Sequence, residues 1–475
     1  MLKKQAFNPI LPSDEYIPDV ETYVFGNRVY LYGSHDCFNG GNFCEKDYVC
    51  WSAPKDDLGN WNFEGVIYEK NKDPLFLKNG EFLYAPDVAL GVDGRYYLFY
   101  SFDLSGVISV AVCDSPAGKY EFYGHVHYPD GTVLGSKEGD PFQFNPCVLI
   151  DNDGRIYLYS GFCPLSEMWD YIGRSAPIVK GAIVTEVKKD MLTVKKNPKI
   201  IVPWYGNSEK TSFEEHPFFE ASSIKKIDEK YYFIYSSMSG HELCCGVSDH
   251  PDKGFVFGGV IISNGDVGFE ERSEEEAMNY TGNNHGSIVN IDGQWYIFYH
   301  RHTNRNQFSR QACAEKIYIK SDGNIDQVEI TSCGLNDGPL HGKGEYGAYI
   351  ACDLMSKKGA ADYMFCSEVP EFHPFFTQEE GKQYIANMMD GAVAGFKYFE
   401  FEDVSKITVA VRGSGNGVIF LGTEPGEKDA GYIKVKPSKE WESFSGKIKL
   451  ENGVKPLFFE YKGKGYVDFL KFIID

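Results

Sequence analysis

The sequence predicts an all-β protein in which a five-bladed β-propeller is followed by a jelly-roll-like β-sandwich. Three observations support this prediction. The 475 residues include 15% aromatic residues and 50 glycines, a composition typical of many strands joined by tight turns. One strand motif recurs five times in the first two thirds of the chain. The remainder carries several segments in which polar and apolar residues alternate.

The recurring motif is a turn of Gly, Asp, Glu or Asn, then one basic or polar residue, then alternating aromatic and aliphatic residues. This pattern predicts a hairpin turn that leads into a strand. Successive copies are 67, 60, 75 and 64 residues apart, which suits a four-stranded propeller blade with its loops. We therefore expect residues 1–325 to form the propeller. The equivalent positions of the five copies are Tyr30, Tyr97, Tyr157, Tyr232 and Tyr296.

A polar residue precedes each of these tyrosines by ten to twelve positions, on the strand before the hairpin turn. In a propeller the first strand of every blade lines the central channel, so five residues in phase would converge near the axis. Any one of them alone would be explained as a turn residue. Because all five are in phase, the sequence predicts a shared functional site. Its members are Asp19, Asp87, Asn145, Glu220 and His285.

Residues 326–475 are predicted to form the second domain. The stretch 334–345 is rich in glycine and turn-forming residues and is typical of a linker. Beyond it, segments 406–412, 417–421 and 467–473 alternate as the strands of an antiparallel sandwich do.

Charge and composition limit the classes of partner that the protein can bind. The chain has 68 acidic and 47 basic residues, a formal charge of −21, which repels nucleic acids and anionic membrane surfaces and favours a neutral partner. No apolar run approaches the roughly 20 residues that span a bilayer. Pro9 and Pro12 interrupt any signal-like segment at the start, so we expect a cytoplasmic protein unless a leader has been removed. The twelve cysteines contain no CxxC pair, which favours free thiols.

Seven short motifs together resemble glycoside hydrolase family 43, over roughly residues 6–325. The resemblance implies a five-bladed propeller that removes α-L-arabinofuranose, β-D-xylose or both from arabinoxylan- or xylan-derived oligosaccharides, acting from the chain end with inversion of configuration. The motifs are Asn8-Pro-Ile-Leu, Ile17-Pro-Asp-Val-Glu, Gly33-Ser-His-Asp36, Tyr84-Ala-Pro-Asp87, His216-Pro-Phe-Phe-Glu-Ala-Ser-Ser223, Asn284-His-Gly-Ser-Ile288 and Tyr299-His-Arg-His302.

The resemblance also implies catalytic roles. An inverting glycosidase needs a carboxylate base that activates water and a carboxylic acid that protonates the leaving oxygen. By motif, Asp19 is similar to the base and Glu220 to the acid. The family's third acidic residue is replaced here by Asn145, whose amide can position Glu220 but cannot raise its pKa by charge. We expect Asp87, also axial, to supply that charge, with burial as the alternative cause of a raised Glu220 pKa.

Further residues are implied to shape the sugar site. His35 and Asp36 would form a subsite, with a simple turn as the alternative. Phe38 and Trp204 are candidate stacking platforms, and Arg310 resembles a family arginine that reaches the pocket, with a surface ion pair as its alternative. His285 has two open roles: a ligand, through water, of a structural calcium ion near the axis, or a metal-free hydrogen-bonding partner. The chemistry itself requires no cofactor.

Other functions stay open at this point. One is an endo-arabinanase, which would need an open groove, and another is a non-catalytic propeller that binds carbohydrate or a protein partner. The order of strands in the tail resembles a family 6 carbohydrate-binding module. A sugar platform and a structural flap packed on the propeller are both compatible with it, and we favour the flap. Retaining fructosidase-like propellers are disfavoured because their Asn-Asp-Pro-Asn-Gly motif is absent.

Overall fold

The computed structural model describes residues 4–76, 82–165, 180–363 and 368–475. Strands dominate these ranges, as the sequence predicts. The helices described are short 3-10 turns, and none is long and apolar enough to cross a lipid bilayer. These turns are η1 (Lys70–Lys72), η2 (Tyr205–Asn207), η3 (Asn264–Asp266), η4 (Phe269–Glu271), η5 (Glu274–Glu276) and η6 (Ala348–Ile350).

Five antiparallel sheets follow one another along the first two thirds of the chain, and each is built from consecutive strands. The first contains β1 (Glu21–Phe25), β2 (Arg28–Tyr32), β3 (Tyr48–Pro54) and β4 (Asn62–Tyr68), and the second β5 (Leu83–Leu90), β6 (Tyr96–Phe102), β7 (Ile108–Cys113) and β8 (Glu121–His125). The third contains β9 (Cys147–Ile150), β10 (Ile156–Ser160), β11 (Gly181–Val187) and β12 (Val194–Pro203), and the fourth β13 (Phe218–Ile227), β14 (Lys230–Ser237), β15 (Glu242–Ser248) and β16 (Val256–Ser263). The fifth contains β17 (Ser287–Ile291), β18 (Gln294–His302) and β19 (Arg310–Ile317), three strands where the repeat predicts four.

The recurring motif forms the second strand of every sheet, namely β2, β6, β10, β14 and β18. The turn before it contains a residue with positive φ in each copy, such as Gly94 at 82° or Asp228 at 52°. Glycine and aspartate tolerate this left-handed conformation, which closes a tight hairpin. The turn chemistry therefore fixes where each second strand begins.

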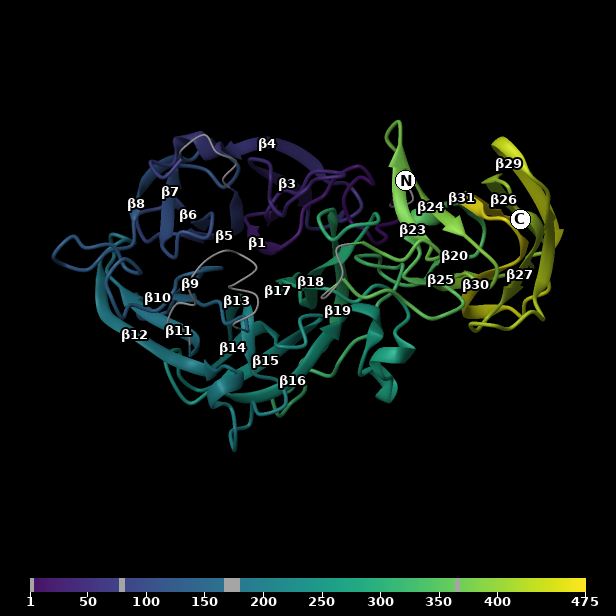
Figure 1. The fold of residues 1–475 in the computed structure, drawn as a ribbon. Helices are drawn as coiled ribbons and strands as arrows, with labels where there is room; N and C mark the ends of the chain where they lie inside the picture. Colours follow the sequence, from purple (N-terminus) through teal and green to yellow (C-terminus); the bar gives the residue numbers. More distant parts are fainter. Residues whose placement is uncertain (1–3, 77–81, 166–179, 364–367) are drawn as a thin grey trace.

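The five sheets surround a common centre. Figure 1 shows β1, β5, β9, β13 and β17 innermost and β4, β8, β12 and β16 at the periphery. Each first strand contacts the first strand of the next sheet, and β17 contacts β1 again. Five hydrophobic clusters fill the spaces between neighbouring sheets, one for each pair, including the fifth sheet with the first. The ring is closed by apolar packing all the way round.

The N-terminal segment joins the end of this ring to its beginning. The Asn8 amide donates to the carbonyls of Ala314 (3.1 Å) and Thr331 (3.0 Å) and to Glu315 Oε1 (2.8 Å). Its own oxygen accepts the N–H of Ala314 at 2.9 Å. A buried asparagine thus fastens the fifth sheet and the segment after it to the start of the chain.

Two further sheets of six strands each make up the last third of the chain and enclose one large hydrophobic cluster. One contains β20 (Leu340–His341), β22 (Asp353–Met355), β25 (Val393–Phe401), β27 (Asn416–Gly422), β28 (Gly431–Val435) and β30 (Gly453–Lys464). The other contains β21 (Gly344–Gly347), β23 (Phe375–Glu379), β24 (Lys382–Met388), β26 (Lys406–Gly413), β29 (Ser438–Lys447) and β31 (Val467–Ile474).

The stretch predicted as a linker, 334–345, is partly built into these sheets. Leu340 pairs with Phe399, and Gly344 pairs with Ile474. The last third of the chain also packs on the fifth sheet: Arg301 of β18 donates to the carbonyls of Tyr349 (2.8 Å) and Ala351 (3.0 Å). A glycine-rich sequence shows where turns occur, but not that the segment between them is unpaired.

Candidate active site

The polar residues that the sequence places in phase all lie at the innermost strands. Asp87 and Glu220 stand within β5 and β13, whereas Asp19, Asn145 and His285 each lie two positions before the first residue of β1, β9 and β17. Asp19 and Asn145 have positive φ angles, 55° and 48°. Asp and Asn are the residues other than glycine that best tolerate this conformation. The backbone therefore bends just before these strands.

Arg310 joins two aspartates at the centre. Its Nε and Nη2 donate to Asp36 Oδ2 (2.8 Å) and Oδ1 (3.0 Å), a bidentate pair, and its Nη1 donates to Asp19 Oδ1 at 3.1 Å. All three side chains are buried. Burial opposes the ionisation of Asp19, but Arg310, together with His285, His300 and Ser34, outweighs burial and lowers the Asp19 pKa to about 2. Asp19 is therefore a carboxylate across the physiological pH range.

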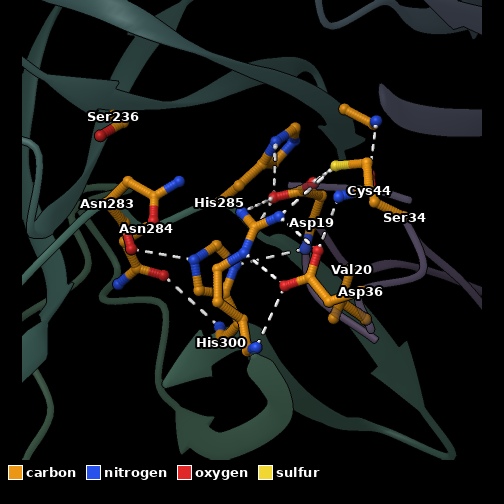
Figure 2. Close-up of polar contacts among 12 residues, drawn as sticks. Asp19, Val20, Ser34, Asp36, Cys44, Ser236, Asn283, Asn284, His285 and His300 are labelled. Carbon is orange, nitrogen blue, oxygen red and sulfur yellow. Dashed lines mark hydrogen bonds and ion pairs between the residues drawn. The ribbon is translucent and has the colours of Figure 1, made fainter. Parts of the chain in front are cut away.

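His300 of β18 holds the backbone of Asp19. Its Nε2 donates to the Asn283 carbonyl at 2.8 Å, so its Nδ1 is the acceptor for the Asp19 N–H at 3.2 Å. The Cys44 thiol lies 3.8 Å from Asp19 Oδ2. Figure 2 shows Asp19 between His285, His300 and Cys44, with Asp36 beside it. The carboxylate is thus fixed from several sides by groups on different elements.

Glu220 is in the opposite ionisation state. Burial raises its pKa to about 8, and the negative charge of Asp19 adds to this rise, while Arg310 and a hydrogen bond from Asn145 lower it. The Asn145 amide lies 3.5 Å from Glu220 Oε2. At neutral pH the site therefore holds one carboxylate, Asp19, and one neutral carboxylic acid, Glu220.

Asp87 belongs to a different group of contacts. Its Oδ1 accepts from the Tyr23 hydroxyl and the Val88 N–H, and its Oδ2 accepts from the Val148 N–H at 2.6 Å. Burial and Asp19, rather than Asp87, account for the raised pKa of Glu220. The expectation that Asp87 supplies that charge is thereby corrected: its two oxygens accept hydrogen bonds from Tyr23, Val88 and Val148 instead.

The remaining predicted sugar contacts lie in varied places. His35 is buried and binds the Asp47 carbonyl (3.0 Å) and Glu15 (2.9 Å), while Asp36 is bound to Arg310. Phe38 is half-buried and stacks on Tyr16, with ring centroids 5.6 Å apart. Trp204 follows β12, the outermost strand of the third sheet, and packs on the cluster between the third and fourth sheets. Among the described residues, Asp36 is the one of these four that contacts the group around Asp19, through Arg310.

The sequence interpretation missed an aromatic cluster beside the acid. Phe144 precedes Asn145 and Phe219 precedes Glu220, and both rings pack on Phe162, at centroid distances of 4.9 and 5.7 Å. Phe142 completes this cluster. Aromatic residues next to the motif residues were the available signal. His300 and Cys44 were also missed, because neither lies at one of the five positions in phase.

His285 has the properties of a neutral ligand or acceptor. Burial lowers its pKa to about 4 although Asp19 lies nearby. Its Nδ1 lies 3.9 Å from Asp19 Oδ1, and its Nε2 is buried without a hydrogen-bond partner in the described parts of the chain. Calcium takes six to eight oxygen ligands, which one imidazole nitrogen and an aspartate already held by Arg310 do not supply. Such an ion would be held mainly by water.

A carboxylate and a protonated carboxylic acid at one centre are what hydrolysis of a glycosidic bond by general acid and base requires. The class of protein that this fold and site define is a glycosidase. The model for glycosyl hydrolases family 43 matches residues 6–325, and the chain belongs to this family. The resemblance seen in the motifs is confirmed, over the same residues.

Comparisons with individual proteins agree. A "Xylosidase/arabinosidase" from Thermoclostridium stercorarium is 51% identical and covers 100% of this chain and 99% of its own. A family 43 beta-xylosidase/alpha-arabinofuranosidase from a compost microbial metagenome, solved with xylotriose in a calcium-free form, has a TM-score of 0.53 at 25% identity, covering 69% of this chain and 98% of its own. A Bacillus subtilis arabinoxylan arabinofuranohydrolase, solved with cellotetraose, has a TM-score of 0.52 at 19% identity, covers 99% of both chains and shows the fold alone.

Proposed function

We propose that this glycosidase is exo-acting and releases α-L-arabinofuranose, β-D-xylose or both from xylan- or arabinoxylan-derived oligosaccharides, with inversion. The observation that carries the chemistry is the pair of opposite ionisation states at Asp19 and Glu220. The sugars are inferred from the relative named xylosidase/arabinosidase, which matches over the whole chain.

In the proposed mechanism Asp19 is the base and Glu220 is the acid. Arg310 keeps Asp19 ionised, so its free oxygen can accept a proton from water as that water attacks the anomeric carbon. Glu220 is protonated at neutral pH and donates its proton to the leaving oxygen. Asn145 orients Glu220 through its amide. His285 offers its free Nε2 to a sugar hydroxyl, to water or to a hydrated calcium ion, and no step depends on that ion.

We further propose that the five sheets are propeller blades and that the two six-stranded sheets form a sandwich, with the domains divided near residue 325. The ring of contacts between first strands and the five clusters between sheets support the first statement. The single cluster enclosed by the last two sheets supports the second. The family 6 likeness of this sandwich stays a prediction.

The function is tested with nitrophenyl arabinofuranoside, nitrophenyl xyloside and dyed arabinan. The expected result is hydrolysis of one or both nitrophenyl glycosides, and NMR should show that the sugar is first released in the inverted anomeric form.

Asp19→Asn and Glu220→Gln should each lower turnover by about 10² to 10⁴ while the protein stays folded. Release of dye from arabinan without nitrophenyl hydrolysis would indicate an endo-arabinanase. A glycosyl azide of retained configuration, formed by either variant in azide, would contradict inversion.

A further inference from the structure

A second group of polar side chains lies on the innermost strands, apart from the catalytic pair. We call Glu21, Asp87, Cys147 and Lys225 the axial cluster. They come from β1, β5, β9 and β13, so four of the five sheets contribute one residue each. The proposed chemistry uses none of them.

The three possible metal ligands of the axial cluster are close together and shielded from water. The ligand atoms of Glu21, Asp87 and Cys147 lie within 4.8 Å of one another, and each of these residues is at most 1% exposed. Two carboxylates held so close without water repel each other unless a cation lies beside them. The cluster therefore has the composition and the charge of a cation site.

A side chain supplies the cation. The Lys225 ammonium lies 3.4 Å from Glu21 Oε2 and 4.0 Å from the centre of the Tyr23 ring, whose hydroxyl donates to Asp87. Burial disfavours its charge, but Glu21, with Cys147 and Asp87, outweighs burial and raises the Lys225 pKa. Lysine thus contacts one acid directly and the other through the tyrosine.

One buried oxygen points to the need for that charge. The two oxygens of Asp87 accept three hydrogen bonds, whereas Glu21 Oε1 has no hydrogen-bond partner in the described parts of the chain, and Glu21 is 1% exposed. Burial and the charge of Asp87 raise the Glu21 pKa to about 7, and Lys225 opposes this rise, so the ionised form of Glu21, with its unpartnered buried oxygen, needs the ammonium. Glu21 thus depends on Lys225 for its compensation.

We propose that the axial cluster is a cation site whose resident cation is the Lys225 ammonium, in the place that a metal ion would otherwise fill. The proposal does not rest on the proposed function. It means that the native protein takes up no metal at the axial cluster, and that removal of the ammonium creates a vacancy for an ion.

The first test is a thermal double-mutant cycle of Lys225→Met, Glu21→Gln and the double variant. Lys225→Met should lower Tm by roughly 5 °C or more, because it leaves two carboxylates uncompensated, and Glu21→Gln added to it should restore much of that loss. Lys226→Met is the matched control: its ammonium pairs with Asp151 at 2.9 Å, outside the axial cluster, and Glu21→Gln should not compensate its loss. If Lys225→Met is insoluble, solubility of the double variant counts as the restoration. Additive losses in the cycle would overturn the proposal.

The second test asks whether a metal can replace the ammonium. A thiol and two carboxylates suit Zn²⁺ better than calcium. Titration calorimetry should show that Lys225→Ala binds one Zn²⁺ per chain more than the native protein, and that adding Cys147→Ser abolishes this extra ion. Loss of a Zn²⁺ site from the native protein on Cys147→Ser would overturn the proposal, because the cluster would then hold metal with lysine present. Absence of any extra site in Lys225→Ala would equally overturn it.

Discussion

Asp19 is buried and Glu220 is half-buried, and their pKa values move in opposite directions. Asp19 is bonded to Arg310, whereas Glu220 is bonded to a neutral amide and lies in the field of Asp19. In the proposed mechanism, the difference between a charged and a neutral neighbour therefore sets which carboxyl acts as the base and which as the acid. The substitution of an acid by Asn145 is compatible with this division because burial and the charge of Asp19 already raise the Glu220 pKa.

The pH profile of kcat/KM should reflect this division. The active form needs ionised Asp19, with a pKa of about 2, and protonated Glu220, with a pKa of about 8, so activity should fall as pH rises through 8. Asn145→Asp places a like charge beside Glu220 and should shift this alkaline limb to higher pH.

Asp87→Asn should leave the alkaline limb in place and lower Tm, because Asp87 accepts three hydrogen bonds elsewhere. A limb that shifts to lower pH in Asp87→Asn would restore the role first expected for it.

At the scale of elements, the hairpin of β18 and β19 holds the proposed base, Asp19, in place. β18 carries His300, which accepts the Asp19 N–H, and β19 begins at Arg310, which binds the Asp19 carboxylate. One hairpin of the fifth sheet thus holds both the backbone and the side chain of Asp19, which lies just before the first sheet. Catalytic geometry here depends on how the fifth sheet meets the first.

Removal of the His300 imidazole should therefore impair catalysis more than stability. In His300→Ala the Asp19 N–H loses its acceptor at a residue with positive φ, and we expect kcat to fall by about 10-fold or more with a smaller change in KM. His302→Ala is the comparison, since His302 binds the same Asn283 carbonyl, at 2.9 Å, but makes no hydrogen bond to Asp19. Equal effects of the two substitutions on kcat would show that His300 acts only by supporting the local fold.

The strands themselves show how far the sequence carried the prediction. Periodic alternation identified the second strand of all five sheets, and the phase of the motif brought Asp19 and Glu220 to the centre. The phase could not reveal the partners of Asp87, whose oxygens accept hydrogen bonds from Tyr23, Val88 and Val148. Nor could it pair Arg310 with Asp36, because the two residues are 274 positions apart and only the closed ring brings them together. The local sequence pattern predicts the strands, whereas contacts across the ring can be identified only from the folded structure.

At the scale of the whole molecule, the last third of the chain supports the fifth sheet. Arg301 lies 4.1 Å from the centre of the Phe376 ring and donates hydrogen bonds to two carbonyls of the last third of the chain. A buried ion pair joins Lys397 to Asp266, 3.1 Å apart, on the other side of residue 325. Tyr280 packs in the cluster enclosed by the last two sheets. These contacts favour the structural flap over an independent sugar platform.

Truncation after Ile325 should accordingly yield insoluble protein or protein with a lower Tm, because buried Arg301 loses the carbonyls of Tyr349 and Ala351 and buried Asp266 loses Lys397. Soluble yield, Tm and kcat/KM on a nitrophenyl glycoside are the measurements, with the full chain purified in parallel as the control. A soluble fragment with full activity and an unchanged Tm would show that the tail is a detachable module.

The bonds of Asn8 have a consequence for the newly made chain. Its partners lie 306 to 323 residues further on, so the first sheet emerges from the ribosome long before the residues that fasten it. Until then the apolar surface that Leu11, Val29 and Leu31 later bury against the fifth sheet has no partner. Contacts between such distant residues make folding slow, and apolar surface exposed meanwhile invites aggregation. The ring of the nascent protein therefore stays open for most of its synthesis. Chaperones can bind the exposed apolar surface until the fifth sheet has been made.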